Sequence, residues 1–158
     1  MGILWPQDVR TKIVTQLNDG TNGIVAQLTA IDTTRGTVTD PPKYIDPVSN
    51  DGNFPSVYVD LGDSTILTPH GTTYALARET LELQVSVIMK HSKNDILRQS
   101  LENYFEAIMR CLQNFDYQAS DGAFFMVANK VSRADLDIQV KETTKGLAVI
   151  FEVHRNEF

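Results

Sequence analysis

Residues 79–115 constrain the fold most, because two different hydrophobic periods follow one another there. Between Glu79 and Lys90 every second residue is apolar, which is the pattern of a β-strand with one buried face. After a short polar break, apolar residues recur at the spacing of a helix with one buried face. This second set comprises Leu97, Leu101, Tyr104, Phe105, Ile108, Cys111, Leu112 and Phe115. The succession predicts a long helix packed across a sheet.

The predicted helix has a start signal and a polar face. Ser92 followed by Asp95 resembles a capping box, with Asp in place of the usual Glu or Gln. We therefore expect the helix to run from there to about Asn114. Its other face carries opposite charges within one turn of each other, which is typical of a surface in water. That face comprises Arg98, Gln99, Glu102, Asn103, Glu106 and Arg110.

The first 31 residues predict helical structure interrupted by a turn. Pro6 suits the first helical position, and Asp8 favours the positive end of a helix that begins there. A glycine inside a helix costs about 1 kcal/mol relative to alanine, so Gly20 and Gly23 favour two short helices over one irregular helix. The apolar residues that share a face are Val9, Ile13, Val14 and Leu17, then Ile24, Leu28 and Ile31.

Two long connections flank the first predicted strand, which alternates over residues 56–61. Residues 32–53 are rich in Thr, Asp, Pro, Gly and Asn, which is the composition of a loop. Residues 62–78 join two strands and are more apolar, which predicts a projecting hairpin arm that needs a partner to cover it. The alternative is that this arm folds back on its own domain. The candidate contact residues with another subunit or partner are Ile66, Leu67, Tyr74 and Leu76.

Three further strands are expected near the C-terminus, at residues 124–127, 135–141 and 147–153. The first is continuously apolar, and the other two alternate on either side of a turn at Thr143–Gly146. The chain is about the size of one ordinary domain. We therefore predict a single α+β domain over residues 1–158. It would have a mixed or antiparallel sheet of about five strands, with an N-terminal helical segment and one long helix packed on it.

Charge and composition limit the classes of function. The formal net charge is −6 and the basic residues are scattered, whereas tight nucleic-acid binding needs clustered Lys and Arg. No stretch approaches the roughly 20 apolar residues that span a bilayer, and the N-terminus has no basic leader. We expect a soluble protein made in the cytoplasm and no membrane partner. The single cysteine, Cys111, is expected to be a small buried hydrophobic residue.

The sequence offers little that resembles a chemical site. It has no nucleophile elbow, phosphate-binding loop or zinc-binding cysteine pair. His70, His91 and His154 lie in three separate segments and are expected to be isolated surface imidazoles. Asp135 and Asp137 would share a strand face, but they alternate with apolar residues and should point to water. We therefore expect no enzymatic activity, no cofactor and no metal site.

Two strand patterns occur in a recognisable order along the chain. After the N-terminal helical segment and the Pro-rich loop comes Phe54-Pro55-Ser56-Val57-Tyr58-Val59. Next come Glu79-Thr80-Leu81-Glu82-Leu83-Gln84-Val85-Ser86-Val87, the long helix and the closing strands. In this order of elements the chain resembles the tail terminator proteins of long-tailed bacteriophages. The resemblance covers nearly the whole chain and depends on element order and these two patterns.

The resemblance implies a structural protein of the virion, assembled in the bacterial host cytoplasm and placed in the tail-neck region. The expected partners are other copies in a ring, usually a hexamer, the tail tube protein, and the head-completion or neck protein. DNA would pass through the ring only as cargo. An adaptor or stopper at the same head-tail junction is the alternative within this class. A small enzyme or ligand-binding domain, or a nucleic-acid-binding protein, would be an alternative from another class.

Overall fold

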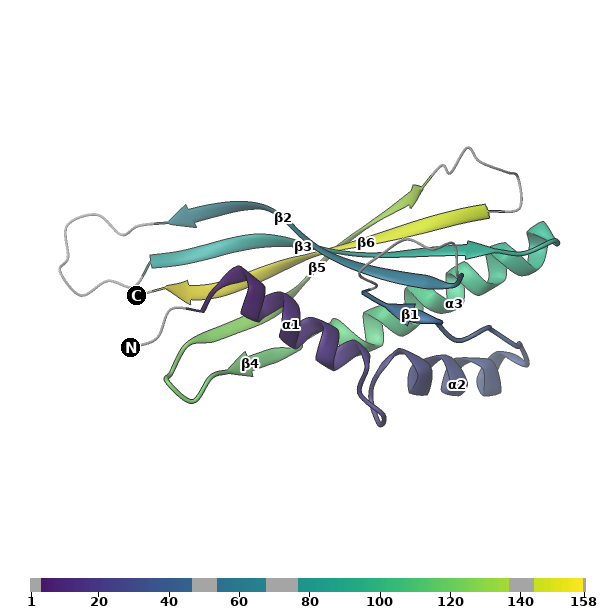
Figure 1. Cartoon of the computed structure of the whole chain (residues 1–158), viewed down its shortest axis with the longest axis horizontal. Helices are drawn as coiled ribbons and strands as arrows, with labels where there is room; N and C mark the ends of the chain where they lie inside the picture. The colour runs from purple at the N-terminus through teal and green to yellow at the C-terminus, as the bar shows by residue number, and fades with distance from the viewer. Residues whose placement is uncertain (1–3, 47–53, 68–76, 137–143, 158) are drawn as a thin grey trace.

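A computed structural model describes residues 4–46, 54–67, 77–136 and 144–157. Within these ranges, a twisted sheet carries the helices on one of its faces (Figure 1). The helices are α1 (Pro6–Leu17), α2 (Ile24–Arg35) and α3 (Asn94–Leu112). The strands are β1 (Tyr44–Ile45), β2 (Ser56–Leu67), β3 (Ala77–Lys90), β4 (Asp116–Gln118), β5 (Phe124–Leu136) and β6 (Thr144–Glu157).

The sheet has the strand order β1-β2-β3-β6-β5-β4. All neighbouring strands are antiparallel except β1 and β2, which are parallel. The two central strands, β3 and β6, pair along their whole length, from Ala77 opposite Glu157 to Lys90 opposite Thr144. Helices and sheet form separate layers, as the predicted α+β class requires, but the described sheet has six strands and not five.

The structure differs from the predicted elements in two short additional strands, in one long strand where two were predicted, and in the ends of α2 and β2. β1 and β4 have two and three residues, which is too short to give a hydrophobic period. Residues 124–127 and the start of the predicted strand at 135–141 belong to one strand, β5, while residues 137–143 lie outside the described ranges. Both predicted loops are shorter than expected, because α2 extends to Arg35 and β2 extends to Leu67.

The hydrophobic core lies between the helices and one face of the sheet. β3 turns its odd-numbered apolar residues into this core, and they are 0 to 4% exposed: Leu81, Leu83, Val85, Val87 and Met89. The predicted apolar face of α3 meets them, with Tyr104 and Ile108 fully buried. Cys111 is buried there too, as predicted, and burial together with nearby Asp19 raises the pKa of its thiol to about 12.

A turn separates α1 from α2, as the glycines predicted. Gly23 precedes α2, and a Cβ atom on it would lie 2.2 Å from the carbonyl oxygen of Asp19. Gly36 ends α2 with a φ of 68°, a left-handed conformation that glycine adopts easily. At the start of α1, the carboxylate of Asp8 accepts the Trp5 backbone N–H at 3.3 Å.

The predicted cap of α3 is wrong. The residue before the helix is Lys93, and its side chain makes no capping hydrogen bond. Its backbone N–H instead donates to Nδ1 of His91 at 2.9 Å. The imidazole therefore organises the turn into α3 that the Ser92 hydroxyl was expected to organise.

Both long outer strands carry a bulge. Between Leu61 and Ser64, β2 advances three residues while β3 advances two. Between Val127 and Val131, β5 advances four residues while β6 advances two. Each outer strand therefore contains extra residues relative to its inner neighbour, and such insertions bend a strand and increase its twist.

Candidate assembly surfaces

One of the predicted contact residues lies fully within the described structure. Ile66 is near the end of β2, and its side chain is 52% exposed. Leu67 is the last residue of β2, and nothing is described of its side chain. Tyr74 and Leu76 lie outside the described ranges. Ile66 is paired with Glu79 of β3, which faces Arg155 of β6. The partner role of all four residues stays a prediction.

Glu79 and Arg155 form a buried ion pair at this end of the sheet. Both side chains are 4% exposed, and Nε of Arg155 donates to a Glu79 oxygen at 2.5 Å. Arg155 also donates to the backbone carbonyl of Leu4. The pair therefore fastens the chain segment before α1 to β3 and β6. Sequence reasoning missed it, although in both strands a charged residue continues the apolar face, next to Leu81 and Val153 respectively.

The second face of the sheet has no described helix or strand packed on it (Figure 1). Cross-strand neighbours on this face include Tyr58, Ser86, Ala148 and Ala134, one from each of β2, β3, β6 and β5. The Tyr58 hydroxyl is buried and has no hydrogen-bond partner in the described part of the chain. Met126, opposite His154, is 41% exposed. This face, called the open face below, is only partly exposed, because Ser86 and Ala148 near its centre are 6% and 1% exposed.

Charged residues occupy one end of the open face. Glu82 of β3 lies directly opposite Glu152 of β6. The two carboxylate oxygens of Glu152 lie 2.5 Å from Nε2 of His154 and 3.5 Å from Nζ of Lys130 on β5, respectively. The hydrogen bond with His154 is the main cause that lowers the pKa of Glu152, and Lys130 adds to it. Glu82 is exposed and forms no ion pair with any described residue, so the carboxylates on these two strands are only partly neutralised.

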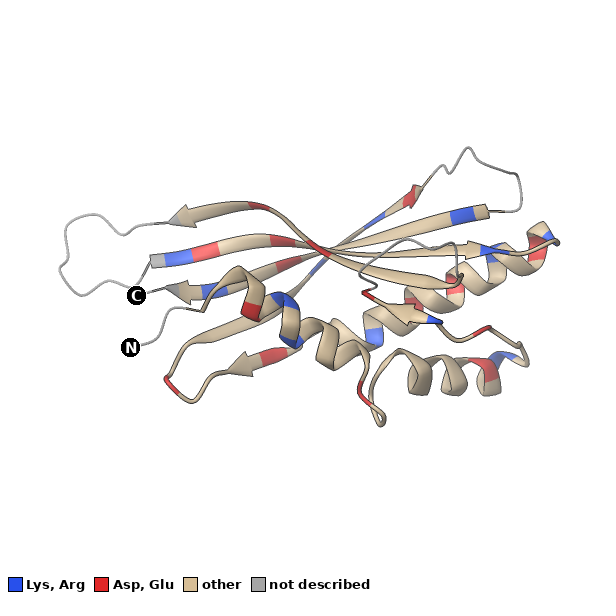
Figure 2. Cartoon of the chain, viewed as in Figure 1, with Lys and Arg blue, Asp and Glu red and all other residues tan. Residues whose placement is uncertain are grey.

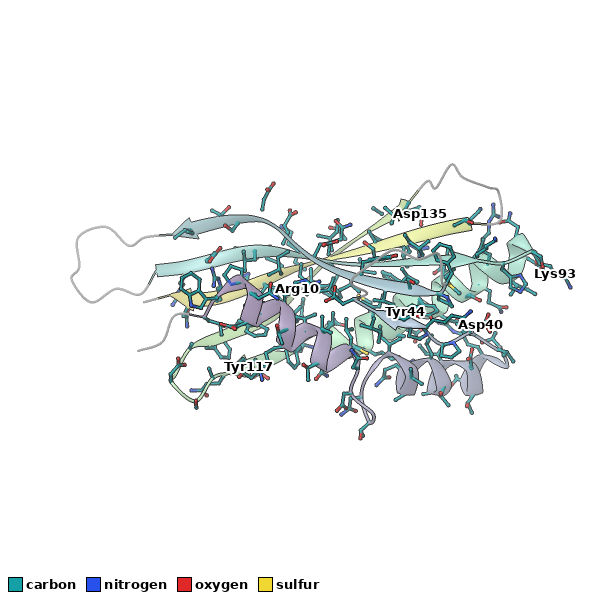
Figure 3. All side chains as sticks on the ribbon, in the orientation of Figure 1. Arg10, Asp40, Tyr44, Lys93, Tyr117 and Asp135 are labelled. Atoms are coloured by element: carbon teal, nitrogen blue, oxygen red, sulfur yellow. The ribbon has the colours of Figure 1, made fainter. Side chains whose placement is uncertain are left out.

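The outer edge of β2 is largely uncovered. β1 pairs only with Ser56 and Val57, and the guanidinium of Arg10 donates to the Val59 carbonyl at 3.0 Å. Figure 3 shows Arg10 on α1 beside the sheet. Beyond that point, no strand among the described residues lies against β2. The open edge of β2 therefore runs over residues 60–67. The side chains at 60 and 63–66 on this edge are exposed, and so is Gly62.

The outer edge of β5 is uncovered in the same way. β4 pairs with residues 124–126, and the Val127 N–H donates to the Phe115 carbonyl at 2.7 Å. Past Val127, the described residues place no strand against β5. Arg133 points back to α3, where it lies 2.5 Å from Glu102. Asp135, near the end of β5 (Figure 3), has a side chain that is 82% exposed.

A buried polar network fixes the segment after α2. The Asn103 side chain, 1% exposed, accepts a hydrogen bond from Arg35 at 2.7 Å. It also donates to the hydroxyls of Thr37 at 3.0 Å and Thr39 at 2.9 Å. Both hydroxyls in turn donate to Asp32. The prediction that Asn103 lies on the solvated face of α3 is wrong, because α2 and the following segment cover it.

The predicted chemical residues are not brought together. Asp135 contacts Arg133, and Asp137 lies outside the described ranges. His91 is in the turn before α3 and His154 is on the open face, while His70 is not described. Across the described ranges, no three His, Cys, Asp or Glu side chains gather in an arrangement that could hold a metal ion. None of the described helices is long and apolar enough to cross a membrane.

Comparisons with known proteins give a likeness in fold but none in sequence. No protein-family model matches the chain, and no curated protein matches it. Among solved structures, the fold is similar to a chain of the virion of a native gene transfer agent particle. The match has 17% identity and a TM-score of 0.46, and it covers 84% of this chain and 91% of that chain. Similarity at this level assigns no function to the chain.

Proposed function

We propose that this protein is a structural subunit of a virion, and more specifically a tail terminator. It would cap the phage tail tube as a homo-oligomeric ring and form the junction to the head. Its partners would be copies of itself, the tail tube protein and a head-completion or neck protein. The same proposal includes the absence of enzymatic activity, since its function would be mechanical.

The observation that carries this proposal is the one-sided core. The helices cover one face of a long sheet, while the open face and the outer edges of β2 and β5 are left without described cover. A sheet in this state offers both face and edge to another polypeptide. The element order also agrees with the resemblance to tail terminators, since a helical segment, a long hairpin, a long helix and closing strands follow in that order.

The charge supports a ring through which DNA passes. Acidic and basic residues are interspersed along the described strands and helices, without a basic stripe (Figure 2). With a net charge of −6, the chain would repel a DNA backbone more than it attracts it. A passage for DNA has to avoid holding it, and an acidic subunit meets that requirement.

The test is a capping experiment with tail tube protein. Purified protein is mixed with polymerising tube protein, and negative-stain images are scored for tube length and for added density at one end. We expect shorter tubes with a ring at one end. Tubes that grow as they do without the protein would contradict the proposal. Binding to the portal-side proteins but not to tubes would favour an adaptor or stopper.

The predicted contact residue Ile66 provides a test variant, and an exposed residue of α3 provides its control. Ile66→Ser removes an exposed apolar side chain near the end of β2, and Gln99→Ser changes an exposed residue on α3. We expect the Ile66 variant to weaken capping while its midpoint of thermal unfolding changes little. A large loss of stability would show that Ile66 belongs to the core of the subunit.

A further inference from the structure

We propose that neighbouring copies of this chain join edge to edge, with the open edge of β2 in one copy paired to the open edge of β5 in the next. The contact would extend the sheet from subunit to subunit without a break. It specifies the self-association of the proposed function and rests on that proposal for its role in a ring. The partner strand at each open edge would come from a second copy of this chain.

The strand directions permit this pairing. β2, β3, β6 and β5 are successive antiparallel neighbours, so β2 and β5 run in opposite directions within one subunit. A second copy in the same orientation then places its β5 antiparallel to β2 of the first copy. Antiparallel pairing is the more favourable kind per residue, and it would continue the alternation already present.

The backbone groups on both edges point outward at regular positions. The carbonyls of Val57 and Val59 accept hydrogen bonds from outside the β2–β3 ladder, so these residues face the outer side. In antiparallel strands, residues whose backbone groups point outward alternate with residues whose backbone groups bond to the neighbouring strand. The register after the bulge places Ser64 and Ile66 among the residues that point outward. By the same alternation from Val127, residues 131, 133 and 135 of β5 direct their backbone groups outward.

Charge favours the unlike edges over the like ones. The β2 edge carries Asp60 and Asp63, which form no ion pair with any described residue. The β5 edge carries Lys130 and Arg133, followed by Asp135. Figure 2 shows acidic segments on β2 and both blue and red segments on β5. Two β2 edges would bring aspartates together, which destabilises a strand pair. On the β5 edge, Lys130 and Arg133 already lie against Glu152 and Glu102 of their own subunit, so this edge does not repel the aspartates of β2. The contact is therefore head to tail, the type that produces rings when it closes.

The positions of the two edges also bear on closure. Asp60 and Ser132 lie in one cross-strand row, through Gln84 and Ile150. From that row, the open part of β2 extends toward one end of the sheet and the regular part of the β5 edge toward the other. The two edges overlap fully only if successive copies are staggered along the strands. Such a stagger accompanies the tilt of strands in closed barrels, so it suits a ring better than a flat ribbon.

Proline variants of the full chain test the pairing. Ser64→Pro and Asp135→Pro each remove one outward N–H without removing a hydrogen bond inside the sheet. Ser64→Ala and Asp135→Ala are the controls, because they shorten the side chain and keep the N–H. Association is measured by sedimentation velocity and light scattering up to about 1 mM, a concentration at which even weak contacts register.

We expect the wild-type chain to associate and each proline variant to raise the dissociation constant by about tenfold or more, since each loses one ladder hydrogen bond and its ring crowds the neighbouring strand. Each variant keeps one intact edge, so an equimolar mixture of the two should form one-to-one dimers. A wild-type chain that stays monomeric throughout, proline variants that associate like wild type, or a mixture that stays monomeric would each overturn the pairing.

Charge-reversal variants cover the case in which a proline variant does not fold. Asp60→Lys with Asp63→Lys should reduce association, whereas Asp116→Lys on β4 should not; equal effects would overturn the pairing. The capping experiment separates this inference from the proposed function. Edge-paired assemblies that do not cap tubes would refute the function and leave the pairing intact. Unimpaired capping by Ser64→Pro would refute the pairing and leave the function intact.

Discussion

Asn103 gives the sharpest test of how the helical layer is held together. Asn103→Ala removes an acceptor from the Arg35 guanidinium and two donors to Thr37 and Thr39. A hydrogen bond to a charged group contributes about 1.5–3 kcal/mol, and a neutral one about 1 kcal/mol. Alanine recovers up to about 0.7 kcal/mol through its helix propensity. We therefore expect a loss of about 3 kcal/mol in the free energy of unfolding.

The assay is urea unfolding followed by far-ultraviolet circular dichroism. The matched control is Gln99→Ala, an exposed position one turn earlier on α3, which should change stability by no more than about 0.5 kcal/mol. If the two variants have the same stability, the network contributes nothing and our assignment of Asn103 is wrong. The slope of the unfolding free energy against urea concentration should stay the same in both variants, because a changed slope would indicate an altered unfolded state.

The pH dependence of the same network has a defined direction. Burial raises the pKa of Asp32, but hydrogen bonds from Thr37 and Thr39 outweigh it and hold the pKa below its usual value. The contribution of Asp32 to stability is therefore complete above the unfolded pKa of about 3.9 and is lost as the pH falls through the lower folded value. The stability difference between wild type and Asp32→Asn should accordingly shrink below about pH 4.

Three further changes should separate contacts that matter from those that do not. Gly23→Ala should destabilise the protein by more than about 2 kcal/mol because a Cβ atom would meet backbone, whereas Gly20→Ala should be nearly neutral because nothing lies within 4 Å; equal melting temperatures would contradict this. Arg155→Met should lower the free energy of unfolding by about 3–5 kcal/mol, since it leaves Glu79 buried without this cation, and adding Glu79→Leu should restore most of that loss. Cys111 should not react with a thiol reagent at pH 8 until urea unfolds the chain, because its thiol is buried and its pKa is about 12; fast labelling of the native protein would show that α3 is packed differently.

The elements with a clear hydrophobic period were predictable from the sequence. α1 and the buried faces of β3 and α3 follow from the spacing of their apolar residues, because burial of one face imposes that spacing. β1 and β4 were not predictable, since strands of two and three residues are defined by their partners. The sequence predicts two strands in the region of β5, because the bulge after Val127 interrupts the alternation of apolar residues.

The buried polar groups were the other part that sequence patterns did not give. Asn103 stands among exposed residues of α3, and only the arrival of α2 and the segment behind it buries that position. Glu79 and Arg155 lie 76 residues apart, and the register of β3 with β6 brings them together. The hydrophobic period of a helix or strand indicates which of its faces is buried, but it does not indicate which other element packs on that face.

The bulges in β2 and β5 have a consequence beyond the single subunit. Each lies at the start of an open edge, after Leu61 in one strand and after Val127 in the other. The open edges of β2 and β5, which would pair with a neighbouring copy, are therefore bent away from the plane of β3 and β6. Copies added to such margins would accumulate rotation at every step. Unlimited stacking into fibrils needs flat, straight borders, and this subunit lacks them on both sides.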